Sequence, residues 1–183
     1  MYDLDVKILA ISDVVEPVLY GAGLSSYADG VKAVISCGDL PFEYLEYVIT
    51  FSGAPLYYVR GNHDPAEDAK SPEGCVPLDG RGVDAGGGLV LAGLSGSRWY
   101  SGGPNQHAER TMRRRAYALS ARTALRGFVG RGRPNVFVSH APPLIDALQQ
   151  LPECNSIMLT KSFSETATAV QPEDVPAWQW PTR

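Results

Sequence analysis

The sequence contains no apolar run near the roughly 20 residues that a membrane-spanning helix requires. It has no excess of basic residues either, and a net charge of −4 gives no indication of binding to nucleic acid or to a membrane surface. Cysteine is scarce and odd in number, with Cys37, Cys75 and Cys154 scattered along the chain. The acidic first residues lead straight into an apolar run, unlike a secretory signal peptide. We therefore expect a cytoplasmic protein with reduced thiols and no membrane partner.

What the sequence does contain is a series of short apolar runs bounded by polar residues and glycines. These runs predict strands at 6–11, 33–37, 55–59, 88–94 and 135–139. Helical spacing of apolar residues predicts helices at 41–51 and 107–129. Because the strands alternate with helices and are apolar throughout, the sequence indicates an α/β fold with a buried, largely parallel sheet. A length of 183 residues suits one main domain.

The second predicted helix is rich in arginine. Met112, Ala116, Leu119 and Phe128 predict an apolar stripe that faces the core, with most of the arginines off that stripe. The run from Arg113 to Arg115 has two interpretations, a solvated helix face or a surface that attracts phosphate, and we favour the first.

The composition changes after Leu151, where serine, threonine and proline become frequent and no clear strand is visible. We therefore predict a main domain at 1–150 and an atypical tail at 151–183 that is loosely docked or disordered.

Four side chains that bind divalent metals follow directly after the predicted strands. Asp13 follows the first strand, Asp39 the second, Asn62 the third and His140 the fifth. In an open α/β sheet the loops at the carboxyl ends of the strands converge on one crevice, so these side chains are expected to meet. Their mixed oxygen and nitrogen donors suit Mn, Fe, Zn or Co better than a pure Mg or Ca site.

A metal centre of this kind has a recognisable chemistry. A carboxylate such as Asp39 can bridge two cations about 3.5–4 Å apart, and such cations lower the pKa of bound water toward about 7 and neutralise phosphate oxygens. His63 lies beside a predicted ligand and is a candidate general acid, with Asp64 as the group that orients its imidazole.

The same residues resemble the signature of calcineurin-like metallophosphoesterases. The resemblance rests on Asp13, Gly38-Asp39, Gly61-Asn62-His63-Asp64 and Ser139-His140-Ala141-Pro142-Pro143, and it spans residues 5 to about 145. It implies a β-sandwich flanked by helices and a two-metal site, in which the match of Asp39 bridges both ions. The matches of Asn62 and His140 would serve one metal and that of Asp13 the other. The match of His63 would protonate the leaving group while metal-activated water attacks phosphorus in line.

The sequence departs from the family pattern in two places. The family has Asp-x-His in its first block, whereas Val15 stands at the histidine position here, and Glu16 is the nearest side chain that could replace it. The family's final Gly-His-x-His block is absent, since the three histidines are His63, His107 and His140. We expect a fold that is incomplete at its C-terminus and a site in which one of the family's two metal positions is badly weakened, which leaves open whether this chain holds two metals or one. A truncated or frame-shifted reading of a longer sequence is our hypothesis for this pattern.

Simpler interpretations exist for single residues. Asp13 and Asp39 could be helix caps or turn formers, and His140 could be a hydrogen-bonded structural histidine. His107 could line a substrate cleft, but a histidine on a surface loop is the interpretation we favour.

Together these observations predict a hydrolase acting on phosphoric ester bonds, with a phosphomonoester or phosphodiester as substrate. The reduced ligand set suggests that its activity is weakened or lost. The alternative is a non-catalytic binding module that keeps the phosphoesterase fold.

Overall fold

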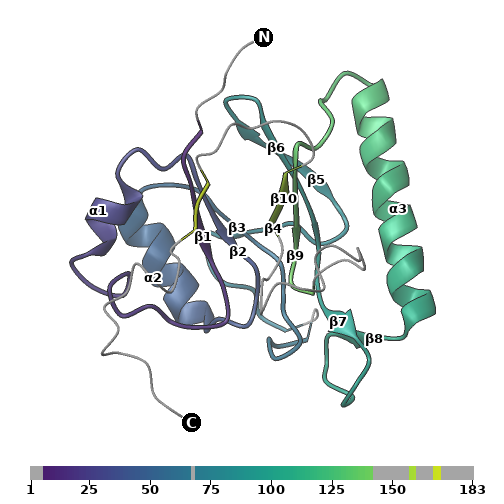
Figure 1. The fold of residues 1–183 in the computed structure, drawn as a ribbon, viewed down its shortest axis with the longest axis horizontal. Coiled ribbons are helices and arrows are strands. Elements are labelled where there is room, and N and C mark those ends of the chain that lie inside the picture. Colours follow the sequence, from purple (N-terminus) through teal and green to yellow (C-terminus); the bar gives the residue numbers. More distant parts are fainter. Residues whose placement is uncertain (1–5, 67–68, 142–156, 160–166, 170–183) are drawn as a thin grey trace.

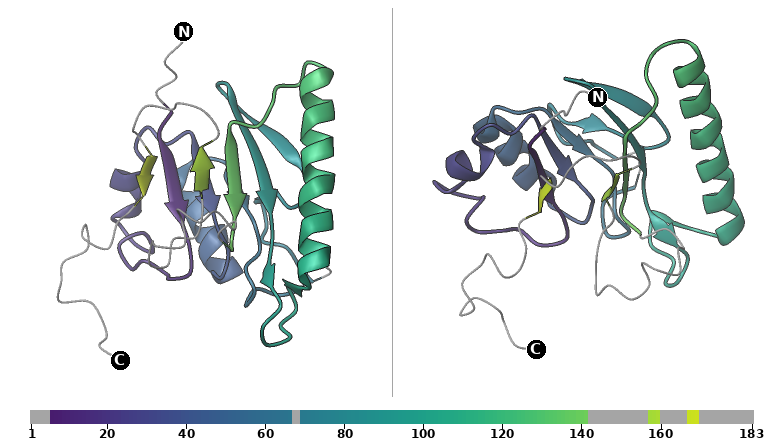
Figure 2. Two further views of the ribbon diagram at one scale, coloured as in Figure 1. Left: turned by 45° about the vertical axis from the view of Figure 1, so that its right-hand side comes forward. Right: turned by 45° about the horizontal axis from the view of Figure 1, so that its top comes forward.

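The computed structural model describes residues 6–66, 69–141, 157–159 and 167–169, which form two main β-sheets (Figures 1 and 2). The first sheet has the order β11-β1-β2-β3-β4, and every pairing in it is parallel. Its strands are β1 (Ile8–Ile11), β2 (Ala33–Ser36), β3 (Leu56–Tyr58), β4 (Val76–Pro77) and β11 (Ala167–Ala169). Parallel pairing brings the carboxyl ends of β1, β2 and β3 to the same edge of the sheet.

The second sheet is mixed and has the order β10-β9-β6-β5. Its strands are β5 (Gly82–Gly86), β6 (Leu89–Leu94), β9 (Val136–Ser139) and β10 (Ile157–Leu159). Strands β6 and β9 are parallel, whereas β5 and β10 are antiparallel to their neighbours. A short parallel ribbon of β7 (Ser97–Arg98) and β8 (Gln106–His107) comes after β6 in the chain.

Helices cover the outer faces of the two sheets. Helices α1 (Leu24–Ala28) and α2 (Phe42–Ser52) lie on the first sheet, and α3 (Glu109–Phe128) lies on the second, on the opposite side of the molecule (Figure 1). Helix α2 follows Pro41 and ends at Gly53, whose left-handed backbone (φ 67°) closes the last turn. The layers therefore run helix, sheet, sheet, helix.

The core is divided by the alternation of side chains along the strands. Leu9 and Ile11 of β1 face α1 and α2, while Ile8 of the same strand faces the second sheet. The cluster between the sheets contains Ile35 and Val138, and both are fully buried. Strands buried on both faces explain why their sequences are apolar throughout.

The sequence predictions for the main elements are confirmed, and the described chain has an α/β architecture. All five expected strands and both expected helices are present, with ends shifted by at most two residues. The structure adds elements that the sequence did not indicate, among them α1, β4 and β5, because their short or polar segments carry weak periodicity. The described residues contain no helix that is long and apolar enough to cross a membrane.

Helix α3 corrects one prediction about its packing. Leu119 is buried and Met112 packs beside it, but Phe128 is 89% exposed and Ala116 is also exposed. Arginines complete the face toward the sheet: Arg122 donates to the carbonyl of Gly80 at 2.8 Å, and Arg126 to that of Gly82 at 3.3 Å. The prediction failed because long arginine stems can cover a sheet while their charged ends reach backbone oxygens at its rim.

The expected tail at 151–183 contains two described segments. Strands β10 and β11 each add to the edge of one sheet, so these two stretches differ from the prediction that no strand follows Leu151. The other residues of 151–183 lie outside the described part of the chain, and the division at residue 150 stays a prediction.

Candidate metal centre

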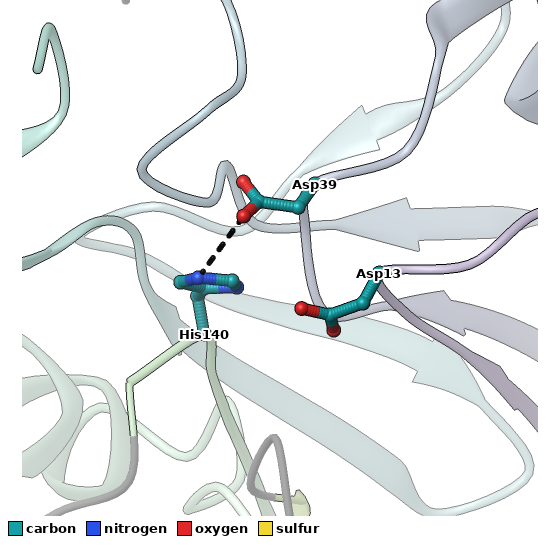
Figure 3. Close-up of side chains that lie close together, drawn as sticks. All are labelled: Asp13, Asp39 and His140. Carbon is teal, nitrogen blue, oxygen red and sulfur yellow. Dashed lines mark ion pairs between the residues drawn. The ribbon is translucent and has the colours of Figure 1, made fainter. Parts of the chain in front are cut away.

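Three of the four predicted metal ligands meet at the carboxyl ends of the strands. One ligand atom each of Asp13, Asp39 and His140 lies within 4.8 Å of the other two (Figure 3). The fourth, Asn62, joins them through its side-chain oxygen, which lies 2.8 Å from Nε2 of His140. Asp13 follows β1, Asp39 follows β2, Asn62 follows β3 and His140 follows β9. The structure therefore brings together the whole ligand set that the sequence predicted.

Both aspartates have an unusual backbone. Asp13 (φ 58°) and Asp39 (φ 57°) are the residues other than glycine that have a positive φ in the described chain. Aspartate tolerates this left-handed conformation better than most residues, yet it still carries strain. The N–H of Asp13 donates to the carbonyl of Gly38 at 3.1 Å, which ties the two loops together. The sharp turns aim both carboxylates at the space beside His140 (Figure 3).

Two glycines permit the close approach of the Asp39 and Asn62 loops. A Cβ added at Gly38 would overlap Gly61 and lie 2.7 Å from its Cα. A Cβ added at Gly61 would overlap the Asp39 carboxylate and lie 2.6 Å from its Cγ. A side chain at Gly38 would therefore push the two loops apart, and one at Gly61 would displace the Asp39 carboxylate.

The hydrogen bonds of His140 fix which ring nitrogen faces the cluster. Nδ1 lies 3.0 Å from the carbonyl oxygen of Cys37, which can only accept, so Nδ1 carries the proton. Nε2 faces the oxygens of Asn62 at 2.8 Å and of Asp39 at 3.5 Å. His140 is buried, with 6% of its surface exposed. In the absence of a metal, Nε2 would have to donate a proton to these acceptors, whereas with a cation between the three atoms its lone pair would bind the ion. The convergence of one ring nitrogen and two oxygens is therefore also the arrangement of a metal ligand set.

Tyr100 sets the orientation of the Asn62 amide. Nδ2 of Asn62 donates to the Tyr100 hydroxyl at 2.6 Å, so the amide oxygen is the atom that faces His140. The loop that carries Tyr100 is itself held by Gln106, whose Oε1 accepts the N–H groups of Tyr100 and Ser101 at 3.1 and 2.9 Å. Sequence reasoning missed both residues, since nothing in the local pattern signals a contact with Asn62.

His63 and Asp64 have different surroundings from those expected. The carboxylate of Asp64 accepts the N–H groups of Asp39 and Gly61 at 2.9 and 2.7 Å, and it is buried. Burial raises the pKa of the Asp64 carboxyl above its usual value, while these two N–H groups oppose the shift. Among the described contacts, the Asp64 carboxylate thus holds the loops of Asp39 and Gly61 together and does not hydrogen-bond the His63 ring.

The His63 side chain is exposed at the mouth of the site. Its backbone N–H donates to Asp39 Oδ1 at 2.9 Å, which fixes His63 directly beside a candidate metal ligand. The side chain borders a pocket of about 380 Å³ that is also lined by Asp39, Phe42 and Pro65. This is a suitable place for a group that exchanges a proton with a bound substrate.

Glu16, which the sequence offered as a replacement ligand, is not a member of the cluster of described side chains. Its backbone carbonyl accepts the N–H groups of Leu19 and Tyr20 at 2.9 and 3.1 Å, in the turn that leads to α1. Among the described residues, the donors of the site are therefore Asp13, Asp39, Asn62 and His140.

Comparisons with protein-family models, with curated proteins and with solved structures find no match to this chain.

Proposed function

We propose that this chain is a metal-dependent phosphoesterase of the calcineurin-like fold, which hydrolyses a phosphomonoester or a phosphodiester. The observation that carries the proposal is the convergence of Asp13, Asp39, Asn62 and His140 from four separate loops. Two face-to-face sheets with outer helices also agree with the β-sandwich that the sequence resemblance implies.

The donor set fits a first-row transition metal. Two carboxylates, one amide oxygen and one imidazole nitrogen, Nε2 of His140, are the mixed ligands that suit Mn, Fe, Zn or Co. Such an ion would activate water for attack on phosphorus and neutralise the charge of the phosphate oxygens. Four donors are enough for one ion, so we propose one principal metal site in this chain.

The residues around the ion have separate tasks. The Cys37 carbonyl keeps the proton of His140 on Nδ1, and Tyr100 keeps the Asn62 oxygen directed at the site. Asp64 holds the Asp39 and Gly61 loops at a fixed distance through their N–H groups. His63, exposed beside Asp39, would donate a proton to the leaving oxygen of a substrate in the adjoining pocket.

The proposal is tested by hydrolysis of a chromogenic phosphate monoester and diester after loading with Mn²⁺. We expect turnover that is removed by chelation and reduced at least about 100-fold in Asp39→Asn, because the variant loses a ligand charge. Asp29→Asn is the matched control, since Asp29 is exposed at the end of α1 and lies outside the cluster. Metal binding without turnover of either ester would favour the non-catalytic binding module. Equal turnover in Asp39→Asn and Asp29→Asn would contradict the proposed site.

A further inference from the structure

A second cavity is lined by residues other than those of the His63 pocket. Its volume is about 210 Å³, which is room for several water molecules or a small anion. The charged side chains that line it are Arg60, Arg81, Arg115 and Asp79. No residue lines both this cavity and the pocket beside His63, so the two are separate.

Asp79 supplies the one carboxylate among the residues that line the cavity, and both of its oxygens have partners. Oδ1 of Asp79 accepts the N–H of Ser95 at 2.6 Å, and Oδ2 forms an ion pair of 2.7 Å with Arg115. His107 adds no positive charge while its Nε2 accepts from Arg115 at 3.0 Å. The negative charge of Asp79 therefore balances the positive charge of Arg115. The positive charges of Arg60 and Arg81 have no counter-charge among the other residues that line the cavity.

Arg60 is a buried cation whose described partners are neutral. It is 6% exposed, and its guanidinium lies 5.0 Å from the centre of the Phe42 ring. It donates to the carbonyl of Pro65 at 2.9 Å, to the hydroxyl of Ser71 at 3.2 Å, and to the carbonyls of Ala69 and Lys70 at 3.4 and 3.5 Å. In the described part of the chain, no carboxylate lies within ion-pair distance of Arg60, so an anion in the adjoining cavity would supply a counter-charge that these described partners do not.

We propose that this cavity binds a small oxyanion, a phosphate or carboxylate group, at a site distinct from the metal centre. Arg81 and Arg60 supply the positive charge, and arginine is the side chain best suited to pair with the oxygens of either group. Ser95 and Asn105 add polar groups to the wall. The site needs no metal, so it stands independently of the proposed hydrolysis.

Hydrogen bonds of Asn105 connect the wall of the cavity to the loop that carries Asn62 and His63. Nδ2 of Asn105 donates to the carbonyls of Gly61 and Asp64, at 2.9 Å in both cases. Asn105 is 5% exposed and also lines the cavity. A bound anion would thus touch the side chain that holds the loop carrying Asn62 and His63.

The test uses the full chain freed of metal with EDTA, which removes any binding of phosphate through the metal centre. Inorganic phosphate and succinate are titrated separately by calorimetry at constant ionic strength. We expect at least one of them to bind with 1:1 stoichiometry, and Arg81→Gln to weaken that binding about tenfold, the loss of one charge-assisted contact. The probe that binds distinguishes a phosphate site from a carboxylate site.

Two controls keep the result decisive. Arg110→Gln removes an exposed arginine of α3 that does not line the cavity, and it is expected to bind the anion as the parent chain does. Circular dichroism checks that Arg81→Gln is folded, which we expect because Arg81 is exposed at its position after β4. Absence of binding by both anions, or equal weakening in Arg81→Gln and Arg110→Gln, would overturn the proposal.

Discussion

The side-chain amide of Asn62 donates a hydrogen bond of 2.6 Å to the hydroxyl of Tyr100, a residue 38 positions away. This bond leaves the amide oxygen directed at His140, 2.8 Å from Nε2. Tyr100 is 63% exposed, so its contribution to the core is small and its hydroxyl is the part that acts on the site.

Tyr100→Phe removes that hydroxyl and keeps the ring. We expect the affinity for Mn²⁺ to fall about tenfold, which is the lower end of the effect of groups that orient metal ligands. The measurement is a calorimetric titration of the metal-free chain. Tyr117→Phe is the control, because Tyr117 is 68% exposed on α3, and its affinity should not change. A parental affinity in Tyr100→Phe would show that the bond does not orient Asn62.

Gly61→Ala tests the close approach of the two metal-binding loops. The new Cβ would overlap the Asp39 carboxylate, so we expect a loss of Mn²⁺ affinity of more than about tenfold. Forced overlap should also destabilise the fold by about 1–3 kcal/mol. Gly21→Ala is the matched control, since its Cβ would meet no atom closer than the Pro17 oxygen at 3.7 Å. If Gly61→Ala bound metal as Gly21→Ala does, Asp39 could not be a ligand in its present position.

The ligand set was predictable from the sequence because two general facts determine it. Apolar runs mark buried strands, and the carboxyl ends of parallel strands meet at one edge, so Asp13, Asp39, Asn62 and His140 were expected to converge on one sheet. The side chains do converge, but only Asp13, Asp39 and Asn62 follow strands of one parallel sheet, whereas His140 follows β9 of the second sheet.

The contacts that support the ligands were not predictable. Tyr100 and Asn105 reach the Gly61 to Pro65 loop across 38 to 44 residues, and their roles depend on where their loop lies in space. Asp64 was assigned to His63 because the two adjoin in sequence, but its carboxylate turns to the N–H groups of Asp39 and Gly61. Helical periodicity likewise could not show that arginines of α3 would bond carbonyls at the rim of the second sheet.

The packing of α3 gives a direct comparison of two of its apolar residues. Leu119 is 4% exposed in the cluster with Ala92 and Leu94, whereas Phe128 is 89% exposed. We expect Leu119→Ala to lower the free energy of unfolding by about 2–3 kcal/mol and Phe128→Ala to change it by less than about 0.5 kcal/mol. Urea denaturation measures both. A larger loss in Phe128→Ala than in Leu119→Ala would contradict this orientation of the helix.

The burial of Tyr44 predicts that the folded chain becomes less stable at alkaline pH. Its side chain is 1% exposed, and burial raises the pKa of Tyr44 to about 12. The unfolded chain loses the phenol proton near the ordinary pKa of about 10, while the folded chain keeps it up to the raised value. The stability due to this shift is therefore fully present below pH 10 and is lost as the pH rises toward 12.

The Tyr44→Phe variant has no phenol proton to lose, so this part of the loss of stability at alkaline pH should be absent from it. Between pH 10 and 12 the free energy of unfolding of the parent chain should fall further than that of the variant, by on the order of 2 kcal/mol. Denaturant unfolding at several pH values measures the difference, and Tyr117→Phe serves as the exposed control. Parallel curves for Tyr44→Phe and the parent chain would refute the prediction.

The most direct measurement of the central claim is the position of Mn²⁺ in a crystal, located by its anomalous scattering. The account predicts a peak in contact with the side chains of Asp13, Asp39, Asn62 and His140, and the loss of that peak in Asp39→Asn. No peak at millimolar Mn²⁺, or a peak elsewhere in the molecule, would contradict it.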